Sequence, residues 1–375
     1  MAKQGFKVLD SDMHVIEPPD LWVRYGDPAF RHRMPRGLTE FRGDLRMVGP
    51  DGTPWGRTEA LATAPRRTGR NFEKNQVRWK PYEEQGWSGQ AQLQAMDVEG
   101  IDVAVLYPSR GLFALTVPDL EPPLAAAIAR AYNDWLADFV QADPTRLLGA
   151  AMISPFAVED AIAEARRAVT ALGFKAVFLR PNIVCHRNWH DPYYDPLWAT
   201  LAELGVPLGF HEGAGARLPQ AGARLGANRM LHHVICHPVE QMMAVTSFCG
   251  GGILERHPTL RVAFLEGNCS WVPFLLWRLD EHVEWLGDVY AQELTLRPSE
   301  YFKRQCFVSV EADEAPARHV IEEGLGGRLV FSTDFPHGDS KFPEAVEHFL
   351  TLPLTDADKR RILWDNCAAY YGLSN

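Results

Sequence analysis

The chain has 375 residues, of which 46% are hydrophobic and 23% are charged, and its formal net charge is −10. This composition is typical of a globular protein with a sizeable buried core. The acidic balance argues against a nucleic-acid-binding protein, which needs a basic surface to neutralise phosphates, but it is compatible with an anionic small-molecule substrate.

The cysteines and the N-terminal segment indicate a compartment. The six cysteines form no Cys-x-x-Cys pair, so we expect reduced thiols and neither a disulfide framework nor a zinc knuckle. The segment Met1–His14 lacks the apolar run of a secretory signal, and no stretch approaches 18 consecutive apolar residues. We therefore expect a cytoplasmic protein that does not cross a membrane.

Eight short apolar or β-branched runs alternate with helical segments along the chain. This alternation indicates β-α-β units and a parallel sheet, and eight runs favour a closed (β/α)8 barrel, the TIM barrel of the α/β class, over an open sheet. Since such barrels exceed about 250 residues as one unit, we expect residues 1–375 to form a single domain. The runs are Phe6–Leu9, Val103–Tyr107, Leu148–Met152, Ala176–Leu179, Pro207–Phe210, Arg261–Leu265, Phe307–Val310 and Leu329–Ser332.

Helices are predicted between the runs from apolar periodicity and from proline or glycine at the ends. They are Pro122–Phe139, Val158–Leu172, Pro196–Leu204, Pro238–Arg256 and Ala357–Tyr371. Residues 18–90 break the alternation, because they are rich in Pro, Gly, Arg and Trp and show little periodicity. We expect a long irregular insertion after the first strand that covers the catalytic face, with its aromatic residues keeping it ordered.

Polar residues follow three of the predicted strands in a pattern that suits a metal. Asp12 and His14 lie two residues apart, so both side chains can reach one ion, while His211 and Asp334 end the fifth and eighth runs. A lone Asp-x-His is mostly structural, but the joint pattern at strand ends predicts a metal site of Asp12, His14, His211 and Asp334. These ligands suit one divalent ion, with Zn²⁺ expected and Mn²⁺ or Fe²⁺ as alternatives.

Four segments together resemble the amidohydrolase-related family of the aminocarboxymuconate-semialdehyde decarboxylase type, and the resemblance spans nearly the whole chain. They are Asp10–Pro18, Met96–Asp102, His257–Val262 and Ser332–His337. The resemblance implies a distorted (β/α)8 barrel with one divalent metal and assigns the metal motifs to the same four residues. Members of that family include non-oxidative decarboxylases of aromatic or enoic acids, hydrolases and hydratases.

The sequence departs from the family at the end of the sixth strand. Decarboxylases of this type often carry a His followed by glycines there, whereas this chain has Glu266 before Gly267. A carboxylate at this place could be a base for water, a further metal ligand, or a hydrogen-bonding partner of a ligand.

Three weaker candidates complete the predicted site. Arg180, at the end of the fourth strand, could clamp a substrate carboxylate or form a salt bridge at the barrel rim. His337, three residues after Asp334, is a candidate acid/base or loop-capping residue, and His237 is a candidate substrate-binding or structural residue at a predicted helix start.

The leading hypothesis is a metal-dependent hydrolase or non-oxidative decarboxylase that acts on a small carboxylated compound, aromatic or enoic. Asp334, Glu266 and His337 are the predicted catalytic residues. The alternatives are a hydratase of the same family and a barrel without catalysis that binds a ligand. The apolar stretch Trp271–Trp285 suits a homodimer contact or the core.

Overall fold

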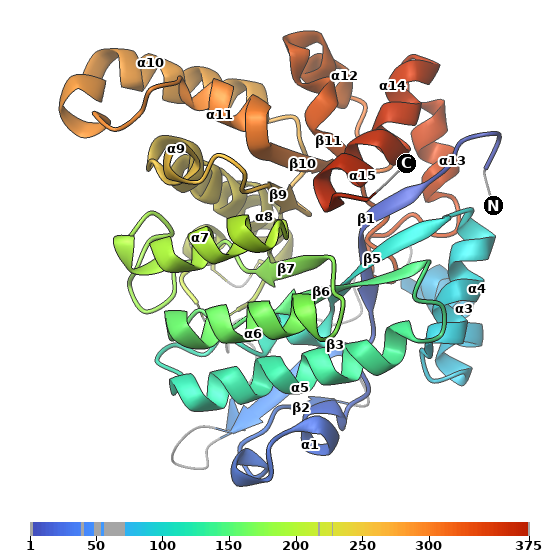
Figure 1. The fold of residues 1–375 in the computed structure, drawn as a ribbon. Helices are drawn as coiled ribbons and strands as arrows, with labels where there is room; N and C mark the ends of the chain where they lie inside the picture. Colours follow the sequence, from blue (N-terminus) through green and yellow to red (C-terminus); the bar gives the residue numbers. More distant parts are fainter. Residues whose placement is uncertain are drawn as a thin grey trace.

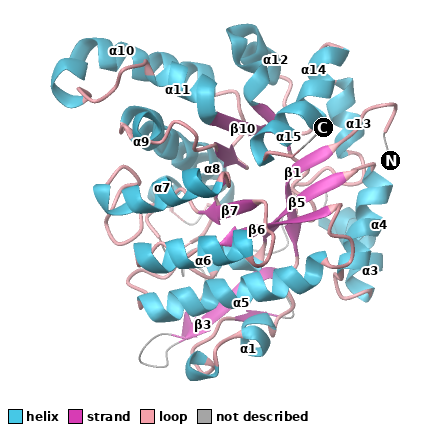
Figure 2. Ribbon diagram, viewed as in Figure 1, coloured by secondary structure: helices cyan, strands magenta, loops and turns pink. Residues whose placement is uncertain are grey.

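Eight parallel strands form the centre of the molecule, and helices surround them (Figure 2). The computed structural model describes residues 3–38, 41–48, 54–55, 72–216, 218–226 and 228–373. The strands pair in chain order, as expected for the predicted TIM barrel (Figure 1). They are β1 (Leu9–Val15), β5 (Val103–Pro108), β6 (Leu147–Met152), β7 (Ala176–Leu179), β8 (Leu208–His211), β9 (Val262–Leu265), β10 (Cys306–Val310) and β11 (Leu329–Phe331).

All eight predicted strands are present, but the first was placed too early. The apolar run Phe6–Leu9 predicted it, whereas β1 begins at Leu9 and continues through Asp12 and His14 to Val15. All seven residues of β1 are buried, including the polar ones. A hydrophobic pattern cannot detect a strand whose buried positions are occupied by aspartate and histidine, because such residues are normally exposed.

Each of the five predicted helices overlaps helical residues, but one was misplaced. The helix predicted to start at Pro238 begins nine residues earlier, and Pro238 lies inside it. Asn228 caps this helix by accepting a hydrogen bond from the Leu231 N–H at 3.2 Å, so the start is fixed by a cap and not by the proline. The helices are α4 (Gly89–Glu99), α5 (Pro122–Val140), α6 (Val158–Thr170), α7 (Asp195–Leu204), α8 (Arg229–Val245), α9 (Ile253–Arg256), α10 (Val272–Tyr290), α11 (Pro298–Gln305), α12 (Ala317–Val320), α13 (Ala345–Thr351), α14 (Asp356–Arg360) and α15 (Asn366–Tyr371). Of these, α4, α10, α11, α12 and α13 were not predicted.

The described part of the predicted insertion is more regular than expected. It contains α1 (Leu21–Tyr25), the antiparallel strands β2 (Arg36–Leu38), β3 (Phe41–Val48) and β4 (Pro54–Trp55), and α3 (Phe72–Glu84). The description as irregular does not hold for these residues, because arginine and glycine interrupt the apolar pattern that would have marked the strands. Residues 56–71 of the insertion lie outside the described residues. Its position over the catalytic face stays a prediction.

Side chains join the first and last strands of the barrel. The strand ladder runs from β1 to β11, and Ser11 Oγ of β1 donates to the Phe331 carbonyl of β11 at 2.6 Å. The Tyr371 hydroxyl donates to the Ser11 carbonyl at 2.5 Å and lies 3.2 Å from the Tyr107 hydroxyl. The backbone N–H of His14 donates to the Phe335 carbonyl at 2.8 Å. Buried hydrogen bonds therefore connect β1 with β11 and the segments that follow it, and we call this junction the seam.

Among the described residues, no helix has both the length and the apolar composition needed to span a bilayer.

The seam predicts a stability effect. We expect Tyr371→Phe to lower the free energy of unfolding by about 1–3 kcal/mol, because it leaves buried polar groups without their partner. Unfolding in urea, followed by circular dichroism, measures this change. Tyr290→Phe is the matched control, since Tyr290 is 81% exposed, and a change in Tyr371→Phe no larger than in this control would contradict the role of the seam.

Candidate metal centre

The C-terminal ends of four barrel strands bring the predicted residues together. Asp12 and His14 lie on β1, His211 ends β8, Glu266 follows β9, and Asp334 lies three residues beyond β11. Parallel strands of a barrel end on one face, which is where such folds build their sites. Glu266 and Asp334 both adopt left-handed backbone, with φ of 48° and 54°, a conformation that is uncommon outside glycine and that clusters at functional sites.

Two backbone carbonyls orient the central histidines. The Nδ1 of His14 lies 2.9 Å from the Pro108 carbonyl, and the Nδ1 of His211 lies 2.7 Å from the Glu212 carbonyl. A carbonyl can only accept, so each Nδ1 carries a proton and each Nε2 faces the other groups of the site. Burial lowers the pKa of His14 to about 4, so its imidazole is neutral at physiological pH. This is the state in which histidine binds a metal.

The two Nε2 atoms face carboxylate oxygens at short range. His14 Nε2 lies 3.2 Å from Asp334 Oδ1, and His211 Nε2 lies 3.1 Å from Glu266 Oε2. Neither Nε2 atom has a hydrogen-bond partner. Lone pairs that face lone pairs in a buried site repel one another unless a cation lies between them. One ligand atom from each of four residues lies within 4.8 Å of the others: His14, His211, Glu266 and Asp334.

Asp12 lies beside the same two histidines. Its Oδ1 is 3.6 Å from His14 Nε2 and 3.4 Å from His211 Nε2. Both of its carboxylate oxygens are buried and lack a hydrogen-bond partner. The residues therefore fit a divalent cation, with nitrogen and oxygen donors that suit Zn²⁺, Mn²⁺ or Fe²⁺. The individual role of each ligand stays a prediction.

His337 pairs with Asp334 and stacks on His14. Its Nδ1 lies 2.6 Å from Asp334 Oδ1, and its ring centroid is 3.9 Å from that of His14. Burial lowers the pKa of His337, but the Asp334 carboxylate raises it by more, so the net pKa is above the usual value. Burial raises the pKa of Asp334, and His337 and His14 outweigh this effect, so its net pKa is low. The pair can therefore hold a proton beside the candidate ligands.

Glu266 and His237 form a second contact at this face. The His237 Nδ1 donates to the Glu266 backbone carbonyl at 2.8 Å and lies 3.4 Å from Glu266 Oε1. Burial lowers the pKa of His237 well below its usual value. Burial, together with Asp334, raises the pKa of Glu266 well above its usual value. His237 is thus a neutral imidazole beside the carboxylate that distinguishes this chain.

Arg180 already has partners on all three of its nitrogens. Its guanidinium pairs with Glu212 at 2.5 Å and also donates to Asn182 Oδ1 at 3.0 Å. The Leu112 and Gly213 carbonyls accept its remaining bonds, both at 2.8 Å. The ion pair with Glu212 is the salt bridge that the sequence offered as the alternative role of Arg180. Binding of a substrate carboxylate by Arg180 stays a prediction.

Two neighbours of the site were not identified from the sequence. Ser109, just after β5, places its Oγ 3.0 Å from His337 Nε2. Glu311 follows β10 and interacts electrostatically with Asp334. Both lie directly beyond a strand end, and that position is the only signal that could have found them.

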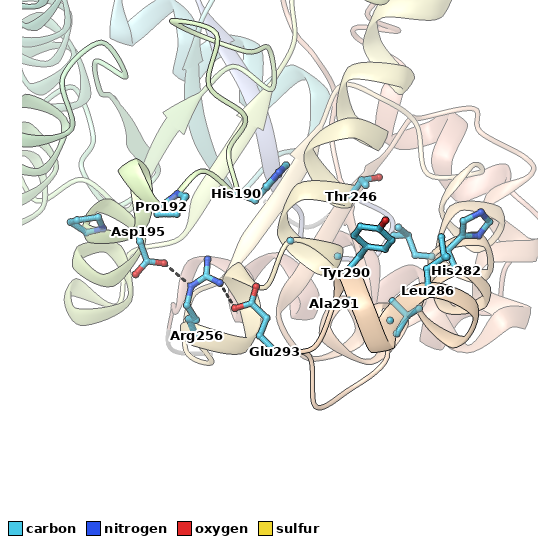
Figure 3. Close-up of a pocket in the computed structure, with 16 residues that line it drawn as sticks. His190, Pro192, Asp195, Thr246, Arg256, His282, Leu286, Tyr290, Ala291 and Glu293 are labelled. Atoms are coloured by element: carbon cyan, nitrogen blue, oxygen red, sulfur yellow. Dashed lines mark hydrogen bonds and ion pairs between the residues drawn. The ribbon is translucent and has the colours of Figure 1, made fainter.

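A separate cavity of about 970 Å³ lies away from these residues. Figure 3 shows Arg256 in this cavity between Asp195 and Glu293, with Tyr290 of α10 nearby. Its lining contains none of the predicted site residues, and its salt bridges satisfy their own charges. We therefore assign the chemistry to the buried cluster, where polar atoms lack partners.

The buried group of His14, His211, Glu266 and Asp334 leads to a prediction about metal binding. His14→Ala should lower the metal affinity by at least about tenfold, because it removes a ligand from a buried set. Metal content per chain after dialysis, measured by plasma mass spectrometry, reports this loss. His319→Ala is the matched control, since that imidazole is 60% exposed. Equal metal content in the two folded variants would contradict the assignment.

Curated relatives align with most of the chain. The protein is 25% identical over 295 residues to a 2-amino-3-carboxymuconate-6-semialdehyde decarboxylase of Dictyostelium discoideum, which covers 76% of this chain and 77% of the relative. It is 29% identical over 296 residues to a gamma-resorcylate decarboxylase of Rhodococcus jostii, covering 75% of this chain and 86% of the relative.

Solved structures share the fold. An amidohydrolase from Mycobacterium avium subsp. paratuberculosis superposes with a TM-score of 0.77 at 23% identity, covering 98% of both chains. A 5-carboxyvanillate decarboxylase from Novosphingobium aromaticivorans, solved with manganese and 4-hydroxy-3-methoxy-5-nitrobenzoic acid, has a TM-score of 0.71 at 18% identity and covers 99% of this chain and 97% of its own.

A family model described as amidohydrolase matches residues 10–373. The first residue of that match lies in β1, which carries two of the candidate ligands, and the last lies just beyond α15. Since this match takes in the whole barrel and every residue of the candidate metal centre, the protein belongs to the amidohydrolase family.

Proposed function

We propose that the protein is a metal-dependent enzyme that removes CO₂, without oxidation, from a small carboxylated compound with an aromatic or enoic skeleton. The observation that carries the proposal is the contact between buried, unpaired imidazole nitrogens and carboxylate oxygens at 3.1–3.2 Å. Decarboxylase relatives and a manganese-containing structural neighbour support this choice.

The cofactor in this proposal is one divalent ion held by His14, His211 and Asp334, with Asp12 beside them. The donor set suits Zn²⁺, the ion expected from the sequence, and the manganese in a structural neighbour supports Mn²⁺ equally. When bound, such an ion polarises the substrate's oxygens and stabilises negative charge.

The chain's own residues supply the proton. Decarboxylation breaks a carbon–carbon bond and leaves the electron pair on the substrate carbon, which must then take up a proton as CO₂ departs. In this proposal the pair of Asp334 and His337 delivers that proton, supported by the 2.6 Å contact between them and by Ser109 Oγ, 3.0 Å from His337 Nε2. The neutral His237 would contact the substrate.

Hydrolysis is the second candidate, and Glu266 is the observation that favours it. Its carboxylate lies 3.1 Å from His211 Nε2, where a general base for a water molecule would be needed. Burial raises its pKa, which brings the carboxylate closer to the range of a base that works near neutral pH. In this candidate, Glu266 accepts the proton of the attacking water, and the pair of Asp334 and His337 protonates the leaving group.

A product assay separates the two reactions. With a panel of hydroxylated aromatic acids and of esters and lactones of such acids, we expect CO₂ release from the acids by the metal-loaded protein and loss of that release after chelation, because the ion stabilises the charge that develops. Headspace CO₂ and liquid chromatography of the products measure the two outcomes. Release of a cleaved acid without CO₂ would support hydrolysis, and activity unaffected by complete metal removal would contradict both.

The variant Glu266→Gln tests whether Glu266 is the general base for hydrolysis. Hydrolysis should fall by about 10²–10⁴-fold if Glu266 is the general base. The matched control is Glu322→Gln, which changes a carboxylate that is 66% exposed. Wild-type hydrolysis by Glu266→Gln would count against that role.

We also propose that the protein forms a homodimer through α10. The predicted stretch Trp271–Trp285 lies on this helix, which projects at the upper left of Figure 1. Phe274, Trp277 and Trp285 are 58–74% exposed on it. Exposed apolar groups that gather on one face are typical of protein–protein interfaces.

We also propose a cytoplasmic location. The six cysteines are free and five of them are buried, which is typical of proteins in a reducing compartment.

The dimer is testable by size. We expect the wild type to elute as a dimer in size-exclusion chromatography with light scattering, and the double variant Trp277→Glu, Trp285→Glu to elute as a monomer, because two charges then lie in the contact. Val77→Glu, which changes a residue that is 74% exposed on α3, is the control. A monomeric wild type would overturn the proposed dimer.

A further inference from the structure

The loop between β11 and α13 carries two groups on which the proposed reaction depends. Asp334 and His337 both lie on this loop, and its residues 332–344 contain neither a helix nor a strand. The start of the loop is fixed to the barrel, because the Phe335 carbonyl accepts a hydrogen bond from the His14 N–H at 2.8 Å. Beyond Phe335 there is no strand ladder to define the path of the backbone, so side-chain packing sets where His337 lies.

Two phenylalanines of the loop belong to an aromatic cluster that includes Tyr82 of α3. Phe335 and Phe342 are 1% and 3% exposed, and their ring centroids are 4.4 Å apart. The Tyr82 ring packs edge to face on both, with centroid distances of 5.8 Å to Phe335 and 5.7 Å to Phe342. The Trp87 ring lies 6.4 Å from the rings of both Tyr82 and Phe335. Edge-to-face contact is a preferred arrangement of aromatic rings, so this cluster orients the loop as well as burying its apolar side chains.

Arg78 of α3 holds the end of the same loop. Its Nη1 donates to the Phe342 carbonyl at 2.8 Å, and its Nη2 donates to Glu344 Oε1 at 3.4 Å. Arg78 and Tyr82 are four residues apart, a spacing that places side chains on one face of a helix. One face of α3 therefore contacts the loop on both sides of His337.

α3 is itself connected to the barrel through α4. Gln85, which follows α3, donates from Nε2 to Gln94 Oε1 of α4 at 2.9 Å. Gln92 of α4 is 4% exposed and donates from Nε2 to the His14 carbonyl at 3.2 Å. The backbone of His14 is thus bonded to the loop through its N–H and to α4 through its carbonyl. The two helices form a support that is joined to β1, and the loop packs against this support.

We propose that Tyr82 and Arg78 are positioning residues, which hold the loop so that His337 stays in place to deliver the proton of the reaction. The inference rests on the proposed function, because it takes proton delivery by the pair of Asp334 and His337 as given. Neither Tyr82 nor Arg78 touches the substrate in this proposal. They act through the loop.

The support should matter more for His337 than for the metal. Asp334 has a second connection to the barrel, because the N–H of Thr333 donates to the Asp10 carboxylate of β1 at 3.3 Å. His337 lies three residues further into the loop, and its Nδ1 is 2.6 Å from Asp334 Oδ1. A displacement of about 1 Å in such a contact lowers the rate of a reaction by about 10²-fold. We therefore expect loss of the support to lower turnover without releasing the metal.

Kinetics of the metal-loaded full chain test the proposal, with the substrate that the product assay identifies. Tyr82→Ala should lower kcat by about 10²-fold and leave KM and metal content at wild-type values. Tyr82→Phe should restore kcat, since the ring makes the contacts in the cluster. Arg78→Met removes the donors but keeps an apolar side chain, so it should also lower kcat, and it serves if Tyr82→Ala does not fold. Val77→Ala is the matched control, because Val77 is 74% exposed on α3.

Hydrogen–deuterium exchange gives a reading that does not need turnover. Peptides from residues 333–344 should exchange at least about tenfold faster in Tyr82→Ala than in the wild type, because amide exchange reports local opening. The same peptides should exchange at the wild-type rate in Tyr82→Phe and Val77→Ala. A peptide that covers β8 should be unchanged in every variant.

The outcomes distinguish this inference from the proposed function. Wild-type kcat in a folded Tyr82→Ala would overturn the inference, and so would a loss of kcat that Tyr82→Phe shares. Loss of metal from Tyr82→Ala would also overturn it, because α3 would then support the ligands and not the proton transfer. A wild type without turnover would overturn the proposed function and the proton-delivering role, and exchange in Tyr82→Ala would then decide whether α3 holds the loop.

Discussion

Two backbone carbonyls decide what the centre of this barrel can bind. The Pro108 and Glu212 carbonyls hold the Nδ1 protons of His14 and His211, and this fixes both rings with Nε2 toward the same buried space. The carboxylate oxygens of Asp334 and Glu266 face those nitrogens. A cation bound among these four groups would connect the fold with its chemistry.

Asp334 links the candidate ligands to the proton-holding pair. It lies among the candidate ligands and also contacts His337 Nδ1 at 2.6 Å. Arg180 forms an ion pair with Glu212 and donates to two backbone carbonyls. These bonds connect the loops at the edge of the barrel. Glu266 is the position where this chain differs from the decarboxylase pattern, and its carboxylate has a histidine on either side.

The barrel and the candidate ligands were predictable because each has a strong local signal. Apolar runs marked the strands, and His211 and Asp334 directly follow two of those runs, while Asp12 and His14 follow the first. The sequence placed the first strand too early, because the buried aspartate and histidine of β1 do not continue the apolar run that marked it. It also misplaced the start of α8, since Pro238 suggested a first turn while Asn228 forms the cap.

The seam between β11 and β1 has a consequence for the life of the chain. His14 comes from the first strand of the barrel in chain order, and Asp334 follows the last. The ladder ends at these two strands, and side chains complete the closure. A cation bound by His14 and Asp334 would link the two strands at the ends of the ladder. Because most of the chain lies between these residues, such a link would lower the entropy of the unfolded chain and so favour the folded state. A chain that is still being synthesised, or is shortened before Asp334, lacks one of the two linked ligands. We therefore expect metal binding to become complete only when the barrel is complete.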